Sequence, residues 1–222
     1  MAGRGRQGRA RKRTRDPEGS KERILKAATA LFTRCGLNGA SLDDISREAG
    51  VNRGLIYHYF RTKESLFDQV LARPLARFVQ SQMELFARAD LDATILREAT
   101  EGLFRFLATH PDLVRLLGWT LAMRRVAGDF GQLEFTRALY ASVCRRIEDA
   151  KREGKIRADV DARQLLITVV DLCVSWHLSR EEWERRFDWD GRDRDALDAE
   201  RMEAIVDFVA AAIRPSGEVR PA

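Results

Sequence analysis

The stretch that most constrains the fold is residues 41–66, SLDDISREAGVNRGLIYHYFRTKESL, which has the pattern of two short helices joined by a tight turn. Ser41 is placed to cap the first helix with its hydroxyl, with Asp44 as its partner three residues on. Ile45 and Ala49 lie four residues apart and form the buried edge of that helix. Gly50 supplies the left-handed residue that ends it. The stretch therefore predicts a helix-turn-helix.

The second helix of this pair is predicted to expose a polar and aromatic face. Asn52 caps it, and Ile56 and Phe60 form its buried side. The residues left on the outside are Arg53, Gly54, Leu55, Tyr57 and His58. Such a face at the start of a helix suits contacts in a DNA major groove. Thr62 caps a further helix at Lys63, where a positive charge and a helix N-terminus would face phosphate together.

The segment from about Lys21 to Val70 resembles the N-terminal DNA-binding domain of the TetR (tetracycline-repressor-like) family of bacterial transcription regulators. The matching residues are the ILKAATALF run of the first helix, Gly36, Ser41, Ile45, Ala49, Gly50, Val51, Gly54, Tyr57, Phe60, Lys63 and Glu64. This string, with its first helix attached, is more specific than a bare helix-turn-helix pattern. The resemblance implies a homodimer, an operator with two half-sites, and a helical C-terminal domain that binds a small molecule.

The resemblance also assigns roles to single positions. Arg53, Gly54 and Leu55 match positions that approach base edges. Positions that mostly hold phosphates are matched by Tyr57, His58, Tyr59 and Lys63. Ser41 matches a hydroxyl position that caps its helix and often contacts the DNA backbone.

Two departures from the family pattern qualify this assignment. Leu55 stands where a polar residue is common, so it offers only apolar contact, as with a thymine methyl. Asp43 and Asp44 stand where some members carry base-contacting cations, so the first helix of the pair is expected to contribute little to base readout. For Tyr57 and Tyr59, a place in an aromatic core remains the alternative to DNA contact.

Positive charge is concentrated at the N-terminus. Residues 1–15 contain seven Arg and Lys and no acid, whereas the whole chain has a net charge of +5. We predict a disordered basic arm over residues 1–16, whose Arg11, Arg13 and Arg15 contact DNA along phosphates or in the minor groove. The alternative is a solvated tail that binds without reading sequence.

Apolar residues recur with helical spacing along the rest of the chain, and no long run alternates with period two. We therefore predict an all-α fold. It comprises a three-helix DNA-binding domain over 17–72, a helical ligand-binding and dimerisation domain over 73–214, and a flexible tail over 215–222. Pro74 is expected to kink or restart its helix. The charged segment 180–198 is expected to be a loop or short helix.

A small-molecule cavity is predicted among the middle helices, because they supply many apolar and aromatic side chains with a few polar groups. The candidate lining residues are Phe104, Leu107, Trp119, Met123, Phe135, Leu139, Trp176 and His177. An ordinary hydrophobic core is the alternative explanation of the same residues. The family resemblance implies that the effector favours a state whose DNA-binding heads no longer match the half-site spacing.

Two late helices, at about 165–178 and 199–213, are apolar on almost every side, which indicates deep burial or a shared interface. Since the resemblance implies dimerisation through the late helices, we expect a two-fold interface there. Its predicted members are Leu166, Val170, Val174, Ile205, Phe208 and Val209. A monomeric core is the alternative.

The predicted function is a ligand-responsive, sequence-specific regulator of transcription, namely a dimeric repressor released from its operator by a small molecule. An activator remains open, and a largely non-specific or architectural DNA-binding protein dominated by its arm is the alternative. An enzyme is not expected, because His58, His110 and His177 are scattered and no catalytic or phosphate-binding motif occurs.

No cofactor or metal is expected either, since the three cysteines lie far apart and have no partner at metal-ligand spacing. The arm lacks the apolar run of a secretory signal, and the longest apolar stretch is too short to span a bilayer. We therefore expect a cytoplasmic protein without a membrane partner.

Overall fold

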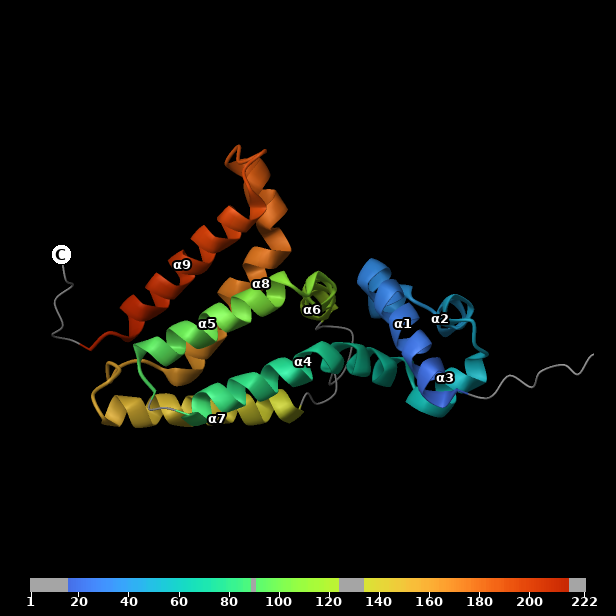
Figure 1. Ribbon diagram of the computed structural model, residues 1–222, viewed down its shortest axis with the longest axis horizontal. Helices are drawn as coiled ribbons and strands as arrows, with labels where there is room; N and C mark the ends of the chain where they lie inside the picture. The colour runs from blue at the N-terminus through green and yellow to red at the C-terminus, as the bar shows by residue number, and fades with distance from the viewer. Residues whose placement is uncertain (1–15, 89–90, 124–133, 216–222) are drawn as a thin grey trace, which may run out of the picture.

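The computed structural model describes residues 16–88, 91–123 and 134–215. Within these ranges the chain is helical and contains no strand, which confirms the predicted all-α fold. The helices are α1 Pro17–Gly39, α2 Leu42–Ala49, α3 Arg53–Phe60, α4 Lys63–Arg88, α5 Ala93–Ala108, α6 Pro111–Met123, α7 Glu134–Arg152, α8 Ala162–Arg186 and α9 Arg194–Ile213. Figure 1 shows α1–α3 gathered at one end of the molecule, with α4 leading from them into the remaining helices.

Several predicted features lie outside the described residues. They are the arm with Arg11, Arg13 and Arg15, residues 216–222 of the tail, and the side chains of Met123 and Phe135.

The first three helices and the start of α4 share one hydrophobic core, which we call the head core. Phe32 of α1 and Phe60 of α3 are almost fully buried in it. The ring of Phe32 meets that of Phe67 from α4 edge-on, with the centroids 5.1 Å apart. Leu113 and Leu116 of α6 complete this core, so a helix of the C-terminal half supports the helix-turn-helix.

Helix α4 continues through Pro74, so the predicted restart of the helix does not occur. A proline in a helix interior removes a backbone hydrogen bond and costs roughly 3 kcal/mol. Packing on both sides outweighs this cost, because Leu71 is buried in the head core and Val79 in the core of the C-terminal helices. The boundary predicted between residues 72 and 73 falls inside this continuous helix.

The segment predicted as a loop or short helix over 180–198 is mostly the ends of two long helices, because α8 extends to Arg186 and α9 begins at Arg194. Ion pairs one turn apart favour the helix where apolar residues run out. Arg180 lies 3.4 Å from Glu184, and Glu182 lies 2.6 and 2.7 Å from Arg185 and Arg186. The end of α8 and the start of α9 project away from the other helices, and we call this part the α8–α9 projection (Figure 1).

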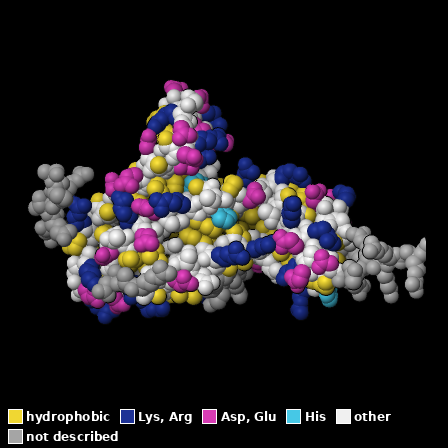
Figure 2. All heavy atoms as spheres, viewed as in Figure 1, with side chains coloured by type: hydrophobic (Ala, Val, Ile, Leu, Met, Phe, Trp, Pro, Cys, Tyr) yellow, Lys and Arg dark blue, Asp and Glu magenta, His cyan; other side chains and the backbone are white. Residues whose placement is uncertain are grey.

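Positive and negative side chains lie side by side over the head, the C-terminal helices and the α8–α9 projection (Figure 2). In the described part of the chain, no helix is long and apolar enough to cross a membrane. Among the same residues, no group of three or more His, Cys, Asp or Glu side chains is arranged to hold a metal ion.

Candidate DNA-binding surface and effector cavity

The turn between α2 and α3 is formed by the capping residues that the sequence predicts. The hydroxyl of Ser41 accepts a hydrogen bond from the Asp44 amide at 3.0 Å and donates one to the Asp44 carboxylate at 2.6 Å, which lowers the pKa of that carboxyl. Gly50 adopts the left-handed conformation with φ of 62°. Asn52 Oδ1 accepts from the Leu55 amide at 2.8 Å. These contacts define two helices that are too short to persist alone.

Helix α3 exposes most of the side chains expected to face DNA. Arg53, Gly54, Tyr57 and His58 are exposed, whereas Leu55 is half-buried against the head core. The accessible face of α3 thus offers a guanidinium, an imidazole and a phenol, together with a residue that has no side chain. Such a face can contact both base edges and phosphates.

Two residues that the family resemblance assigns to phosphate have partners within the head. The hydroxyl of Tyr59 donates to the backbone oxygen of Pro17 at 3.1 Å. Lys63 Nζ donates to the backbone oxygen of Ala40 at 3.0 Å, which ties the start of α4 to the end of α1. The Tyr59 hydroxyl is thus engaged within the head, while Lys63 keeps further N–H donors that could reach phosphate.

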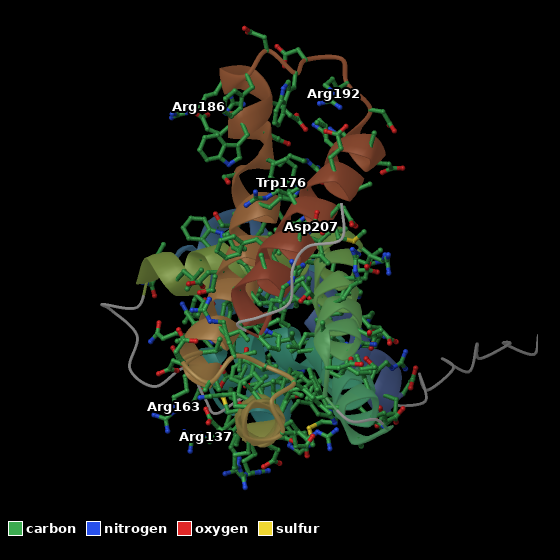
Figure 3. The ribbon with its side chains drawn as sticks, turned by 90° about the vertical axis from the view of Figure 1, so that its left-hand side faces the viewer. Arg137, Arg163, Trp176, Arg186, Arg192 and Asp207 are labelled. Atoms are coloured by element: carbon green, nitrogen blue, oxygen red, sulfur yellow. The ribbon has the colours of Figure 1, made fainter. Side chains whose placement is uncertain are left out.

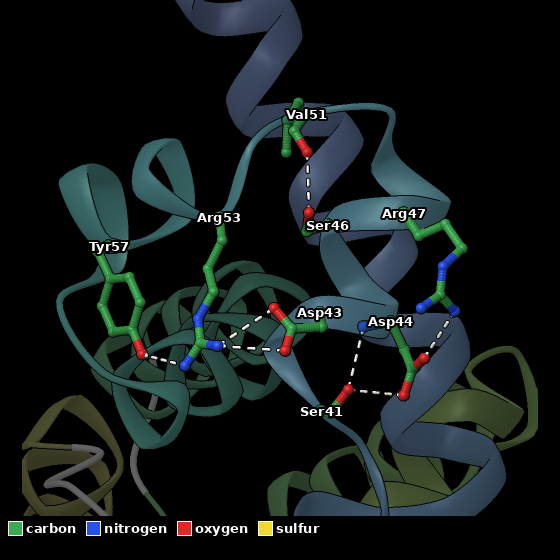
Figure 4. Close-up of polar contacts among 8 residues, drawn as sticks. All are labelled: Ser41, Asp43, Asp44, Ser46, Arg47, Val51, Arg53 and Tyr57. Atoms are coloured by element: carbon green, nitrogen blue, oxygen red, sulfur yellow. Dashed lines mark hydrogen bonds and ion pairs between the residues drawn. The ribbon is translucent and has the colours of Figure 1, made fainter.

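Arg53 is held between the two helices of the motif (Figure 4). Its Nη1 donates to both carboxylate oxygens of Asp43 at 3.1 and 3.2 Å, and its Nη2 donates to the hydroxyl of Tyr57 at 2.8 Å. All three side chains are exposed. Sequence reasoning treated Asp43 only as a missing cation and overlooked this role. The signal was the pairing of an acid on one helix with an arginine at the start of the next.

A partly open, mostly apolar cavity of about 320 Å³ lies among the C-terminal helices, with walls from α4 to α9. Two of the residues predicted to bind a ligand, Leu107 and Leu139, line it. Four residues predicted for the dimer interface line it as well, namely Leu166, Val170, Val174 and Val209. Val174 and Val209 are buried within the single chain, whereas Leu166 and Val170 are half-buried.

Four other predicted ligand residues, Phe104, Trp119, Trp176 and His177, do not line this cavity. The ring of His177 packs on Phe104 with centroids 4.5 Å apart, and its Nε2 lies 3.1 Å from the Phe104 backbone oxygen. Burial lowers the pKa of His177. Trp176 Nε1 donates to Asp198 at 2.7 Å and joins α8 to α9. These residues are structural, which periodicity alone could not reveal.

Trp119 connects α6 to the head. Its Nε1 donates to the backbone oxygen of Thr33 at 3.3 Å. Its ring packs on Gly36, where a Cβ atom would come within 3.0 Å of the ring. Gly36 also has a φ of 69°, so both the backbone and the close approach require glycine there. On its other side α6 contributes Leu117 and Leu121 to the cavity wall, so this one helix contacts both sites.

The dimer prediction is corrected for three of its residues on α8 and α9. Val174, Ile205 and Val209 are buried in the core of the single chain and leave almost no surface for a partner. Phe208, in contrast, is 57 % exposed on α9. Ile167 and Leu178 of α8 are exposed as well, so an uncovered apolar surface does remain on the two late helices.

A larger and more open groove, of about 1440 Å³, runs between α7 and α8. Charged side chains line it, among them Arg137 and Arg163, which point outward at the lower left of the view in Figure 3. Small-molecule sites are typically enclosed and mostly apolar. The smaller cavity comes closer to this character than the groove does, because it is less open and mostly apolar side chains line it.

The fold and the exposed α3 define a helix-turn-helix regulator with a helical C-terminal domain. Residues 24–70 match the family described as bacterial regulatory proteins, tetR family, and residues 96–210 match the tetracyclin repressor-like C-terminal domain. The chain belongs to the TetR family of bacterial transcription regulators, which confirms the predicted resemblance. The family is regulatory.

Individual proteins show the same relationship. The chain is 32 % identical to the transcriptional repressor SCO4008 of Streptomyces coelicolor, over 72 % of this chain and 79 % of that one. SCO4942 from Streptomyces coelicolor superposes with a TM-score of 0.66 at 25 % identity, covering 89 % of this chain and 99 % of that one. The regulator FadR from Bacillus subtilis, solved in complex with stearoyl-CoA, superposes with a TM-score of 0.66 at 18 % identity, covering 87 % of this chain and 99 % of that one. This similarity is one of fold.

Proposed function

We propose that this protein is a dimeric repressor that binds an operator through α2 and α3 and leaves it when a small molecule occupies the cavity. The position of α6 is the observation that carries the proposal. Leu117 and Leu121 line the cavity, while Leu113 and Leu116 of the same helix complete the head core. The relatives add support, since SCO4008 is named a repressor and FadR holds stearoyl-CoA within the same fold.

Helix α4 provides a second connection between the two sites. It begins in the head at Lys63 and reaches the cavity wall at Phe78, Gln82 and Phe86 without a break. A change in the cavity wall would move the head as a rigid body. A ligand releases DNA only if it binds better to the state in which the two heads no longer match the half-sites.

The DNA contacts are assigned by exposure and chemistry. We infer that Arg53 contacts a base edge and that the absent side chain of Gly54 lets the backbone approach DNA. Ser41, Tyr57 and His58 would contact phosphate, with Lys63 in support. The arm, with Arg11, Arg13 and Arg15, would add contacts along the backbone or in the minor groove. Such a protein acts where the chromosome is, in the bacterial cytoplasm.

We infer that two copies associate through α8 and α9. Ile167, Leu178 and Phe208 are large apolar side chains exposed on these helices, and exposed apolar area of this kind often marks an interface. Of the predicted interface residues, Phe208 is exposed and Leu166 and Val170 are half-buried, so these three remain candidates.

The test is fluorescence anisotropy of the full chain with DNA flanking its own gene, against excess random DNA at near-physiological salt. Tight binding that resists the competitor is expected of a specific regulator. Binding that the competitor abolishes, with a steep dependence on salt, would instead favour a general DNA-binding protein dominated by its arm.

A further inference from the structure

One buried polar side chain of the cavity wall has no hydrogen-bond partner among the described residues. Gln82 and Thr100 are the two buried polar side chains among the described residues, with 8 and 3 % of their surface exposed, and both line this cavity. Thr100 donates its hydroxyl proton to the backbone oxygen of Leu96 at 2.7 Å. The carboxamide of Gln82 forms no hydrogen bond with any described residue. It is therefore free to bind a ligand.

Position 102 on α5 leaves room for this carboxamide. A Cβ atom at Gly102 would lie 3.2 Å from Gln82 Nε2, so the amide packs directly against the glycine. A buried amide without a partner costs free energy. The polar atoms of Gln82 are not fully closed off from solvent, so the amide reaches open cavity space, where a ligand oxygen can replace water.

The charge of the wall limits what this ligand can be. The described lining residues include no Lys, Arg or His, and the one ionisable carboxylate among them, Asp171, is exposed. A carboxylate or phosphate held beside Gln82 would be buried without a counter-charge from these residues, which is strongly unfavourable. An uncharged oxygen could accept a hydrogen bond from the carboxamide without that cost.

We propose that the effector is a compact lipophilic molecule whose one buried polar group is an uncharged oxygen that hydrogen-bonds to Gln82, and that anions are excluded. This inference rests on the proposed function of the cavity as the effector site. A ketone, an alcohol or an ester on a hydrocarbon skeleton has this chemistry. A fatty acid with the carboxylate at this position does not.

The experiment compares two probes of equal chain length, decan-2-one and decanoate, by calorimetric titration of the full-length protein. Decan-2-one is expected to bind at least tenfold more tightly than decanoate. Gln82→Leu should weaken decan-2-one roughly tenfold, the value of one buried hydrogen bond. Gln80→Leu is the matched control, because Gln80 lies two residues away on the exposed side of α4 and bonds to Glu84; it should leave the affinity unchanged.

The melting temperature of the free protein is a second readout that does not depend on the probe. Gln82→Leu should raise it, because a polar side chain without a protein partner in a mostly apolar wall is replaced by an apolar one, while Gln80→Leu should not. Equal or tighter binding of decanoate, unchanged affinity in Gln82→Leu, or failure of both probes to bind would overturn the inference. Binding with the expected preference but without release of operator DNA would leave the ligand class standing and overturn the proposed regulation.

Discussion

Arg53 illustrates how a single contact can prepare a side chain for recognition. A free arginine loses about 2 kcal/mol of rotamer entropy when it is fixed. Here Asp43 and Tyr57 orient the guanidinium through contacts within the head itself. Part of the ordering cost is thus met by the protein, and we infer that Asp43 is a positioning residue for base readout.

Removing Asp43 should lower specificity without lowering affinity for random DNA. We expect Asp43→Ala to reduce the preference for operator over random DNA roughly threefold to tenfold, because Arg53 is no longer oriented. Glu48→Ala is the control, since Glu48 is an exposed acid of the same helix α2. Both variants lose one negative charge, so only the difference between them reports on orientation. Competition anisotropy measures it, and equal preferences in the two variants would contradict the role.

Truncating Arg53 itself measures how much its side chain contributes to the free energy of operator binding. Arg53→Ala should cost about 1–3 kcal/mol of operator binding and relax the base preference at one position in each half-site. A panel of operators with single base changes, measured by the same competition, would reveal the relaxed position. A uniform loss on all sequences would mean that Arg53 contacts phosphate.

Among the elements, α4, α6 and α8 show what periodicity predicts and what it leaves open. Helical spacing indicated each of these helices. It could not show that α4 passes through Pro74, because that depends on packing of Leu71 and Val79 in two separate cores. Nor could it show that α8 continues into its charged end, where ion pairs such as that between Glu182 and Arg186 replace apolar contacts.

The role of α6 in coupling the two sites can be tested at Trp119. We expect Trp119→Ala to keep binding of decan-2-one to the free protein, because Trp119 does not line the cavity. The loss of operator affinity on adding decan-2-one should shrink at least threefold, because α6 loses its contacts with Thr33 and Gly36. Trp183→Ala is the control, since Trp183 is similarly exposed but lies on the α8–α9 projection. Full release in Trp119→Ala would place the coupling elsewhere, with α4 as the next candidate.

At the scale of the whole molecule, DNA affinity is expected to depend on the basic arm. Deleting residues 1–15 should reduce the slope of log affinity against log salt by about four to six per subunit, because fewer counterions are released. A variant with glutamine at all seven basic positions should show the same reduction if charge is the cause. An unchanged slope after deletion would show that the arm does not contact DNA.

The assembly of two chains is the other property of the whole molecule. We expect Phe208→Asp to shift the protein from dimer toward monomer at micromolar concentration in sedimentation equilibrium, because a charge replaces an exposed apolar side chain of α9. Met83→Asp, an exposed position on α4, should leave the mass unchanged. A monomeric wild-type chain would refute the proposed interface outright.

The local sequence by itself determined the helix-turn-helix and the family, because caps such as Ser41 and Asn52 and turn residues such as Gly50 act within a few positions along the chain. The tertiary structure alone decided which apolar residues line the cavity, since Leu107 and Phe104 have the same pattern and different surroundings. It also showed that three predicted interface residues, Val174, Ile205 and Val209, are buried within the single chain. It revealed that Gln82 lies in the cavity wall without a hydrogen-bond partner among the described residues, and that Asp43 pairs with Arg53. Burial and partnership depend on residues distant in sequence, and periodicity carries no information about them.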